Sequence, residues 1–147
     1  MNYKKAILLD ANILVRAILG VKVPTILDKY QNIVNFYTAS QCFDEVNEHL
    51  PLILAKRGIK SDKTMLQIKQ LKTVVHQFNE SIYLNAKDEA QARIQSQDID
   101  DWPLIALSIL FNYPIWTEDK DFFGTGVPTW RTHNVEIYLQ EIGRAHV

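Results

Sequence analysis

Short apolar segments of strand length alternate with amphipathic segments of helical period, and this alternation constrains the fold more than any other feature of the chain. Residues 6–10 (AILLD) have the composition of a strand buried on both faces, and residues 11–19 continue with a helical pattern that stops at Gly20. Residues 33–40 (IVNFYTAS) and 113–119 (YPIWTED) are further strand candidates. Strands that alternate with helices pair in parallel, so we expect an α/β fold with a central, mostly parallel β-sheet flanked by helices.

The helices before and after the second strand have recognisable starts and stops. Pro24 marks the first turn of the earlier helix. Ser40 is placed to cap a helix over residues 41–57, which Pro51 bends and Gly58 ends. We expect the apolar stripes of these helices to pack in the core.

Further helices and a short extended segment fill the middle of the chain. Ser61 is expected to cap an amphipathic helix with an apolar stripe made of Met65, Ile68, Leu71, Val75 and Phe78. Residues 81–85 (SIYLN) suit a short strand or an extended link, and Asn85 then caps a helix over residues 86–95. The clearest apolar helix covers residues 101–112, opened by Asp101 with Pro103 in its first turn.

The composition indicates one ordinary domain. The chain has 147 residues, of which 47% are apolar and 22% charged, so we expect a single domain over residues 1–147. Cys42 is the only cysteine, and therefore no intrachain disulfide can form. No apolar run has the length of a signal-peptide core or a membrane span. These features predict a cytoplasmic protein with no membrane partner.

Four acidic residues lie where strands end or helices begin. Asp10 ends the first strand, and Asp119 follows the strand that ends at Thr117. Glu45 and Asp101 fall near the starts of helices. Segments that follow different strands of an open parallel sheet converge beyond the carboxyl ends of those strands. Each acid alone suits a helix cap or a turn, but together we expect the four carboxylates to face one pocket.

Such a cluster of carboxylates requires a cation or protonation to persist. Two like charges about 4 Å apart repel by about 4 kcal/mol at an effective dielectric of about 20. Carboxylate oxygens suit Mg²⁺ or Mn²⁺, whereas the histidines and Cys42 have no spacing typical of zinc. The histidines also lack a nucleophile partner, and the chain has no glycine-rich phosphate loop, which disfavours Ser-His-Asp, Cys-His and P-loop chemistry.

Four segments resemble the acidic blocks of the PIN-domain nucleases, in the same order and at similar intervals: LLDANILVRAIL, FDEVNEHL, DIDDWPLIALSIL and IWTEDKDFFG. The resemblance covers most of the chain, and within this family the chain is similar to the VapC-type toxin ribonucleases. Its last two blocks are the most specific, because an acid pair opens an apolar, alanine-containing helix and a later strand runs into Thr-x-Asp-x-Asp-Phe. The resemblance implies a three-layer PIN-like fold.

The same resemblance implies which residues form the site. The catalytic and metal-binding acids are Asp10, Glu45, Asp101 and Asp119. The neighbours that orient ligands or water are Asn12, Thr117 and Asp121. Asp98 and Asp100 are alternatives to Asp101, which we prefer because it stands nearest the start of the apolar helix. Glu48 competes with Glu45, but it lies nearly a full turn deeper in its helix.

A PIN-like site implies a metal-dependent endoribonuclease that hydrolyses RNA phosphodiester bonds. A bound Mg²⁺ or Mn²⁺ lowers the pKa of a water molecule and stabilises charge on the phosphate. It also reverses the local charge of an acidic pocket that would otherwise repel RNA. Many small bacterial members are toxins of type II toxin-antitoxin modules, so a cognate antitoxin and a homodimer are expected partners.

Basic residues are concentrated away from the acidic segments. Residues 56–72 carry six cations against Asp62 alone, a net charge of +5, whereas residues 88–101 carry five acids against Arg93, a net charge of −4. The basic stretch suits either a solvated helix face or a grip on the phosphate backbone. For the second case, the predicted nucleic-acid contacts are Lys56, Arg57, Lys60 and Lys63.

Three other functions fit the sequence less well. Acids in all four blocks disfavour a catalytically silent PIN-like module that only binds RNA or protein. A phosphorylation-receiver domain would need a paired acid before the first loop and a lysine at the end of a later strand. A haloacid-type phosphatase would need Asp-x-Asp after the first strand, where Asn12 takes the second acidic position.

Overall fold

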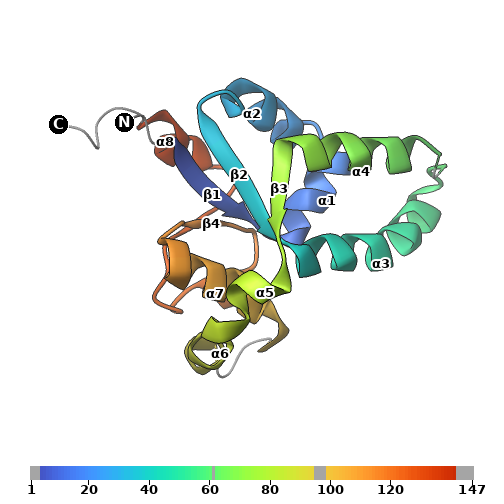
Figure 1. Ribbon diagram of the computed structural model, residues 1–147. Coiled ribbons are helices and arrows are strands. Elements are labelled where there is room, and N and C mark those ends of the chain that lie inside the picture. The colour runs from blue at the N-terminus through green and yellow to red at the C-terminus, as the bar shows by residue number, and fades with distance from the viewer. Residues whose placement is uncertain (1–3, 61, 95–98, 142–147) are drawn as a thin grey trace.

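Five parallel strands form one sheet in the order β3-β2-β1-β4-β5 (Figure 1). The computed structural model describes residues 4–60, 62–94 and 99–141. The strands are β1 (Lys5–Leu9), β2 (Val34–Ala39), β3 (Val75–Phe78), β4 (Ile115–Trp116) and β5 (Thr129–Trp130). The expected α/β fold with a parallel central sheet is confirmed.

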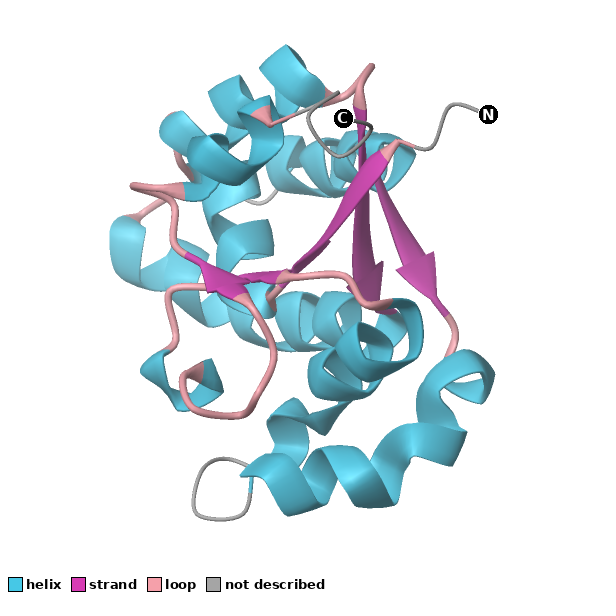
Figure 2. Cartoon of the chain, turned by 90° about the vertical axis from the view of Figure 1, so that its left-hand side faces the viewer, coloured by secondary structure: helices cyan, strands magenta, loops and turns pink. Residues whose placement is uncertain are grey.

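Helices lie on both sides of the sheet (Figure 2). One group consists of α1 (Ala11–Leu19), α2 (Lys22–Tyr30), α3 (Ser40–Arg57) and α4 (Asp62–Val74), and the other consists of α5 (Glu80–Tyr83), α6 (Lys87–Ile94) and α7 (Trp102–Phe111). In the second group α7 packs against β1 and β2, with α5 and α6 against α7. Right-handed crossovers explain this division. The chain crosses the sheet in one direction from β1 to β2 to β3, which places α1–α4 on one face, and it crosses in the opposite direction from β3 to β4, which places α5–α7 on the other face.

The centre of the sheet is apolar because both of its faces are covered. Ile7, Leu8 and Leu9 of β1 are fully buried, as are Phe36 of β2 and Trp116 of β4. The β1–α1 unit matches its sequence pattern, since α1 begins after Asp10 and its C-cap is Gly20. Trp116 is therefore a core residue.

The apolar stripe expected over residues 65–78 is wrong at both ends. Helix α4 ends at Val74, and Val75 and Phe78 belong to β3, where Val75 pairs with Phe36 of β2. Met65 is 73% exposed rather than in the core. The helical spacing continues into β3 by coincidence, and pairing with β2 decides the conformation.

Three smaller expectations also fail. Residues 81–85 are helical, split between α5 and the 3-10 helix η1 (Leu84–Ala86), because buried Tyr83 packs edge-on against Trp102. Ser40 is the first residue of α3 rather than its cap, and its Oγ lies 3.2 Å from the Tyr83 hydroxyl. Asn85 lies inside η1, which runs directly into α6. Ser61 lies outside the described residues.

The end of the chain adds elements that the sequence pattern did not indicate. Two further 3-10 helices, η2 (Ile99–Asp101) and η3 (Lys120–Phe122), flank α7 and β4, and α8 (Val135–Gln140) follows β5. Within the described residues, no helix has both the length and the hydropathy needed to cross a bilayer. The two short 3-10 helices matter most, because both carry acids of the candidate site.

Candidate active site

The acids predicted for the site gather at the carboxyl edge of the sheet. Asp10 follows β1, and Asp119 follows β4, the strand next to β1. The strand order reverses at this pair, since β2 lies on one side of β1 and β4 on the other. Ligand sites of open parallel sheets form in the crevice at such a switch point. Helix α7, preceded by Asp101, begins at the same edge.

Asp10 both caps α1 and lines a cavity with Asp101. Its Oδ1 accepts a hydrogen bond from the Ala11 amide at 2.7 Å, and its Oδ2 accepts from Thr117 Oγ1 at 2.7 Å and Asn12 Nδ2 at 3.0 Å. Burial raises the pKa of Asp10, the charge of Asp119 raises it further, and the three hydrogen bonds oppose both effects. Asp10 is therefore the cap of α1, and its second oxygen is bonded to Thr117 and Asn12, two other residues predicted for the site.

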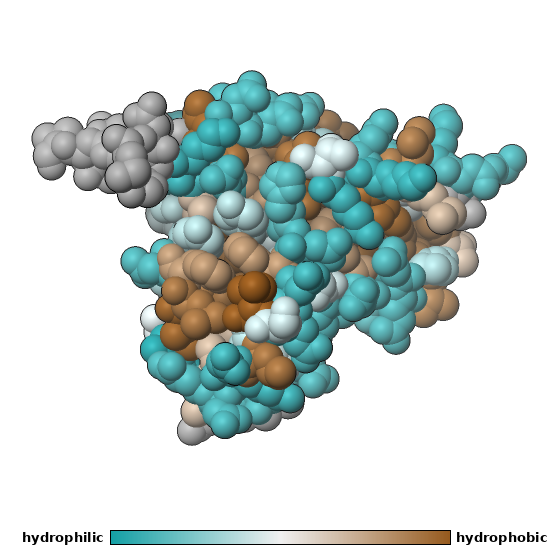
Figure 3. Space-filling view, viewed as in Figure 1, coloured by the Kyte–Doolittle hydropathy of each residue, from teal (hydrophilic) through white to brown (hydrophobic). Residues whose placement is uncertain are grey.

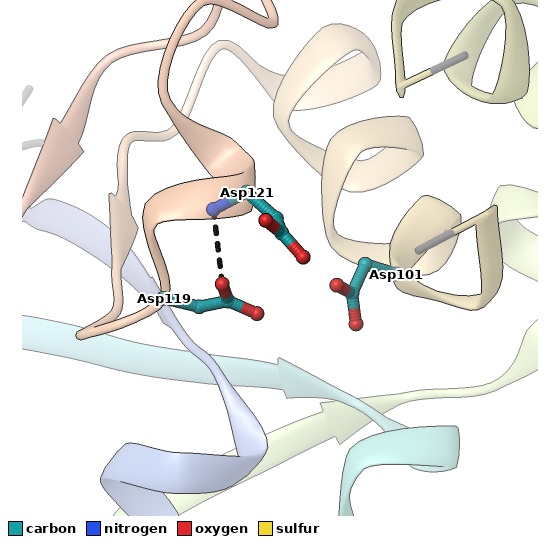
Figure 4. A group of neighbouring side chains, drawn as sticks. All are labelled: Asp101, Asp119 and Asp121. Carbon is teal, nitrogen blue, oxygen red and sulfur yellow. Dashed lines mark hydrogen bonds between the residues drawn. The ribbon is translucent and has the colours of Figure 1, made fainter. Parts of the chain in front are cut away.

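Three carboxylates form a tight cluster beside Asp10. One oxygen each from Asp101, Asp119 and Asp121 lies within 4.8 Å of the others, and Figure 4 shows the three side chains facing a common space. Asp119 Oδ1 also accepts a hydrogen bond from the Asp121 amide at 2.9 Å, which folds η3 back toward Asp119. At 4.8 Å, two unit charges repel by about 3.5 kcal/mol at an effective dielectric of about 20.

This donor set fits a divalent cation. Mg²⁺ binds oxygen ligands at about 2.0–2.1 Å in octahedral geometry, so its ligand oxygens lie about 3–4 Å from one another. The spacing of the Asp101, Asp119 and Asp121 oxygens is compatible with such a shell after small side-chain adjustments. A cation would also remove the repulsion within the cluster. The residues present therefore fit a hard divalent ion.

The structure divides the predicted metal ligands into two groups. Asp101 and Asp119 belong to the tight cluster, and Asp121, expected only as a supporting neighbour, joins them. Asp10 and Glu45 line a narrow cavity together with Asp101. Cys42 lines the same cavity. Burial raises the pKa of its thiol, and the nearby charges of Asp10 and Glu45 raise it further.

The alternative acids occupy a different position. Asp100 and Glu48 line an acidic pocket of about 390 Å³ with Glu45 and Asp101, so this pocket continues outward from the narrow cavity. Neither Asp100 nor Glu48 joins the tight cluster of described carboxylates. Asp98 lies outside the described residues. Of the two described acids in its block, Asp100 and Asp101, it is Asp101 that lies close to Asp119.

A network of hydrogen bonds supports the loop that carries Asp119 and Asp121, two of the three clustered acids. Thr117 Oγ1 accepts from the Asp119 amide at 2.9 Å and from Asn12 Nδ2 at 3.4 Å. Asn12 Oδ1 accepts from the Glu118 amide at 3.3 Å. Asn12 and Thr117, predicted as orienting neighbours, are thus in contact with Asp10 and with this loop.

Glu118 is a supporting residue that the sequence analysis missed. Its Oε1 accepts a hydrogen bond from the Thr132 amide at 2.8 Å, and its Oε2 accepts from Arg131 Nε at 3.3 Å. Burial alone would raise the pKa of Glu118, but these bonds and the charge of Arg16 lower it below its usual value. The only sequence signal is its place in the Thr-Glu-Asp triplet, between two site residues.

The predicted nucleic-acid contacts lie at a distance from the cluster. Lys56 and Arg57 end α3, Lys63 is the second residue of α4, and Lys60 lies between the helices; all four are exposed. Figure 1 shows α3 and α4 extending away from the sheet, with the end of α3 and the start of α4 farthest from it. Lys56 lies eleven positions after Glu45 in α3, which corresponds to about 16 Å along the helix axis.

An apolar groove of about 650 Å³ runs between α3 and α4. Its floor includes Leu50, Leu54 and Ile68, and Lys69 and Lys72 lie among its lining residues. Near its rim Met65 is largely exposed. The α3–α4 pair thus combines apolar surface with positive charge.

Comparisons with known proteins agree with this geometry. A family model described as "PIN domain" matches residues 8–140. The structure is similar to "VapBC2 from Rickettsia felis bound to a DNA fragment from their promoter", with a TM-score of 0.67 and 12% identity over 86% of this chain and 98% of that chain. No curated protein matches the sequence. The family match, which spans all four acidic segments, shows that the chain belongs to the PIN-domain family of nucleases.

Proposed function

We propose that the protein is a Mg²⁺- or Mn²⁺-dependent endoribonuclease and the toxin of a type II toxin-antitoxin module. The observation that carries this proposal is the convergence of Asp101, Asp119 and Asp121 within 4.8 Å at the switch point of the sheet. Membership of the PIN-domain family supports nuclease chemistry at that place. The reducing cytoplasm suits a chain whose one cysteine, Cys42, is free and buried.

Each site residue then has a role. Asp101, Asp119 and Asp121 would hold the divalent ion, which when bound supplies an activated water and stabilises charge on the phosphate. Asp10 contributes a buried negative charge behind the cluster, where Thr117 and Asn12 fix its orientation. Glu45 lines the cavity on the α3 side of Asp101.

The basic end of the α3–α4 pair is the proposed grip on the RNA backbone. The cluster itself is acidic, so phosphates need positive charge at another point, and the cations at this end are exposed. Their distance from the site implies that they contact nucleotides flanking the scissile bond. The contacts proposed are Lys56, Arg57, Lys60 and Lys63.

Exposed apolar surface supports two proposed protein partners, an antitoxin and a second copy of this chain. The groove between α3 and α4 suits an apolar segment of an antitoxin, with acidic residues against Lys69 and Lys72. Figure 3 shows a second apolar area over α7, where Leu110 and Phe111 are exposed. We assign this area to a homodimer contact, which light scattering of the wild type and of Phe111→Lys tests: the variant is expected to be monomeric.

RNA cleavage tests the central proposal. Purified wild-type protein is incubated with end-labelled single-stranded and hairpin RNAs in Mg²⁺, in Mn²⁺ and in EDTA. We expect cleavage in either ion and none in EDTA, and loss of cleavage in Asp10→Asn and Asp101→Asn. Asp28→Asn, an exposed acid on α2, is the matched control and should cut normally.

Two outcomes would contradict the proposal. Cleavage that survives in both folded site variants would show that the acids do not carry the chemistry. Wild-type protein that binds Mn²⁺ and RNA without cutting any RNA of the panel would favour the silent binding module instead. Circular dichroism establishes that each variant is folded.

A further inference from the structure

Glu118 joins three elements at the carboxyl edge of the sheet. It follows β4 directly after Thr117, its amide donates to Asn12 of α1, and its carboxylate accepts from Thr132 and Arg131, which follow β5. The carboxylate is mostly buried, with 18% of the side chain exposed. The next residue along the chain is Asp119 of the acidic cluster.

The Glu118 carboxylate takes the place of a backbone acceptor in the sheet. The pairing of β4 with β5 is only two residues long, and the Thr117 amide donates to the Trp130 carbonyl at 2.9 Å at its end. Bonds of a parallel ladder recur evenly, so the Thr132 amide is the next donor in line. It donates to Glu118 Oε1 instead of to a backbone carbonyl. The side chain of Glu118 thus adds one hydrogen bond to the pairing of the two strands. We call the bonds of Glu118 to Thr132 and Arg131 the Glu118 tie.

This tie acts on the loop that carries two of the three clustered acids. Residues 117–121 leave the sheet here, and repulsion among Asp101, Asp119 and Asp121 favours an outward movement of the loop. The bonds of Glu118 to Thr132 and Arg131 oppose that movement. They also orient the Glu118 carboxylate toward β5, so this fourth acid pairs with Arg131.

We propose that Glu118 is a positioning residue that sets the affinity of the acidic cluster for its divalent ion from outside the cluster. The inference rests on the proposed function in one respect, the assignment of the cluster to a divalent cation. Outer partners that orient metal ligands typically change metal affinity by about 10–100-fold when they are removed. The loss expected for Glu118 lies in that range.

Titration with Mn²⁺ alone, followed by isothermal calorimetry, tests the inference without any nuclease assay. Glu118→Ala removes the tie and is expected to bind Mn²⁺ about 10–100-fold more weakly than the wild type. Glu118→Gln removes the charge but keeps an acceptor for the Thr132 amide, so its affinity should stay closer to the wild type than to Glu118→Ala.

Glu136→Ala is the matched control. Glu136 Oε1 accepts hydrogen bonds from Tyr30 at 3.0 Å and Lys29 at 3.4 Å and joins α8 to α2. The control loses a comparable tie that does not touch residues 117–121, so its Mn²⁺ affinity should equal that of the wild type. If Glu118→Ala does not fold, Arg131→Ala replaces it: a lost tie weakens Mn²⁺ binding, whereas a purely electrostatic effect of removing a cation strengthens it.

The outcomes separate this inference from the proposed function. Wild-type protein that does not bind Mn²⁺ overturns the proposed function and the inference with it. Wild-type binding with an unchanged affinity in Glu118→Ala overturns the inference alone. Equal weakening in Glu118→Gln and Glu118→Ala also overturns it, because charge rather than position would then explain the effect. Tighter binding in Arg131→Ala has the same consequence.

Discussion

Replacing Asp121 by asparagine is expected to stabilise the metal-free protein and to destabilise the metal-bound protein. The Asp121 carboxylate lies within 4.8 Å of those of Asp101 and Asp119, so the substitution removes two repulsive pairs. The backbone N–H of residue 121, which donates to Asp119 Oδ1, is unchanged by the substitution. Opposite effects in the two states are characteristic of a cation site, because the charges that repel one another without the ion are the ones that bind it.

The size of the metal-free effect follows from the separation of the charges. Each pair at 4.8 Å contributes about 0.9 kcal/mol at the dielectric of water and about 3.5 kcal/mol at a dielectric of about 20. The three side chains are only half-buried, and solvent and salt screen them, so the lower limit applies. Two pairs then give about 2 kcal/mol, or a rise in Tm of about 4–8 °C.

Thermal unfolding measured by calorimetry provides the assay. In EDTA near neutral pH, Asp121→Asn should unfold at a higher temperature than the wild type. At a Mn²⁺ concentration of about 100 times Kd, the wild type gains about 2.7 kcal/mol, and the variant should lose most of that gain. The control Asp28→Asn should behave as the wild type in both conditions. A lower metal-free Tm for Asp121→Asn, or an undiminished response to Mn²⁺, would show that these three carboxylates do not form a cation site.

Three other predictions concern the surroundings of the cluster. Burial raises the pKa of Asp10 above 3.8, so the contribution of this carboxyl to the free energy of unfolding is greatest below that pH and falls as pH rises through the folded pKa. In urea unfolding of the metal-free proteins, the free energy of unfolding of Asp10→Asn should therefore increase relative to that of the wild type from about pH 4 to pH 7. A difference that stays constant with pH would count against this. Thr117→Val removes the donor to Asp10 Oδ2 and should lower the free energy of unfolding by about 1–3 kcal/mol, whereas Thr73→Val, at an exposed helical position, should change it little. The proposed RNA contacts are Lys56, Arg57, Lys60 and Lys63. Alanine at all four positions should weaken RNA binding and reduce its salt dependence, as measured by fluorescence anisotropy. An unchanged salt dependence would show that these residues do not contact the RNA backbone.

The elements that the sequence predicted well are those whose pattern has one physical cause. The strand at β1 is apolar throughout because both faces are buried, and Asp10 and Gly20 delimit α1. The strand β3 was missed because it lies at the edge of the sheet, where His76 and Gln77 are exposed and no apolar run forms. Its conformation depends on pairing with β2, and a local pattern does not contain that information.

The candidate site was predictable to the level of the edge where it forms. Acids that follow parallel strands converge there, which brought Asp10 and Asp119 together as expected. Two short 3-10 helices, η2 and η3, decide which carboxylates come within 4.8 Å of one another. The bond from the Asp121 amide to Asp119 turns η3 so that Asp121 lies beside Asp101, and this local turn was not readable from the spacing.

The most direct test of the cation site at Asp101, Asp119 and Asp121 is a Mn²⁺ titration of the ¹⁵N-labelled protein followed by NMR, because the paramagnetic ion broadens the signals of nearby residues. We expect the backbone amide signals of Asp10, Asp101, Asp119 and Asp121 to disappear first, at substoichiometric Mn²⁺. Selective broadening of Glu48 and His49, which line the outer acidic pocket, or uniform broadening of the whole spectrum would contradict it.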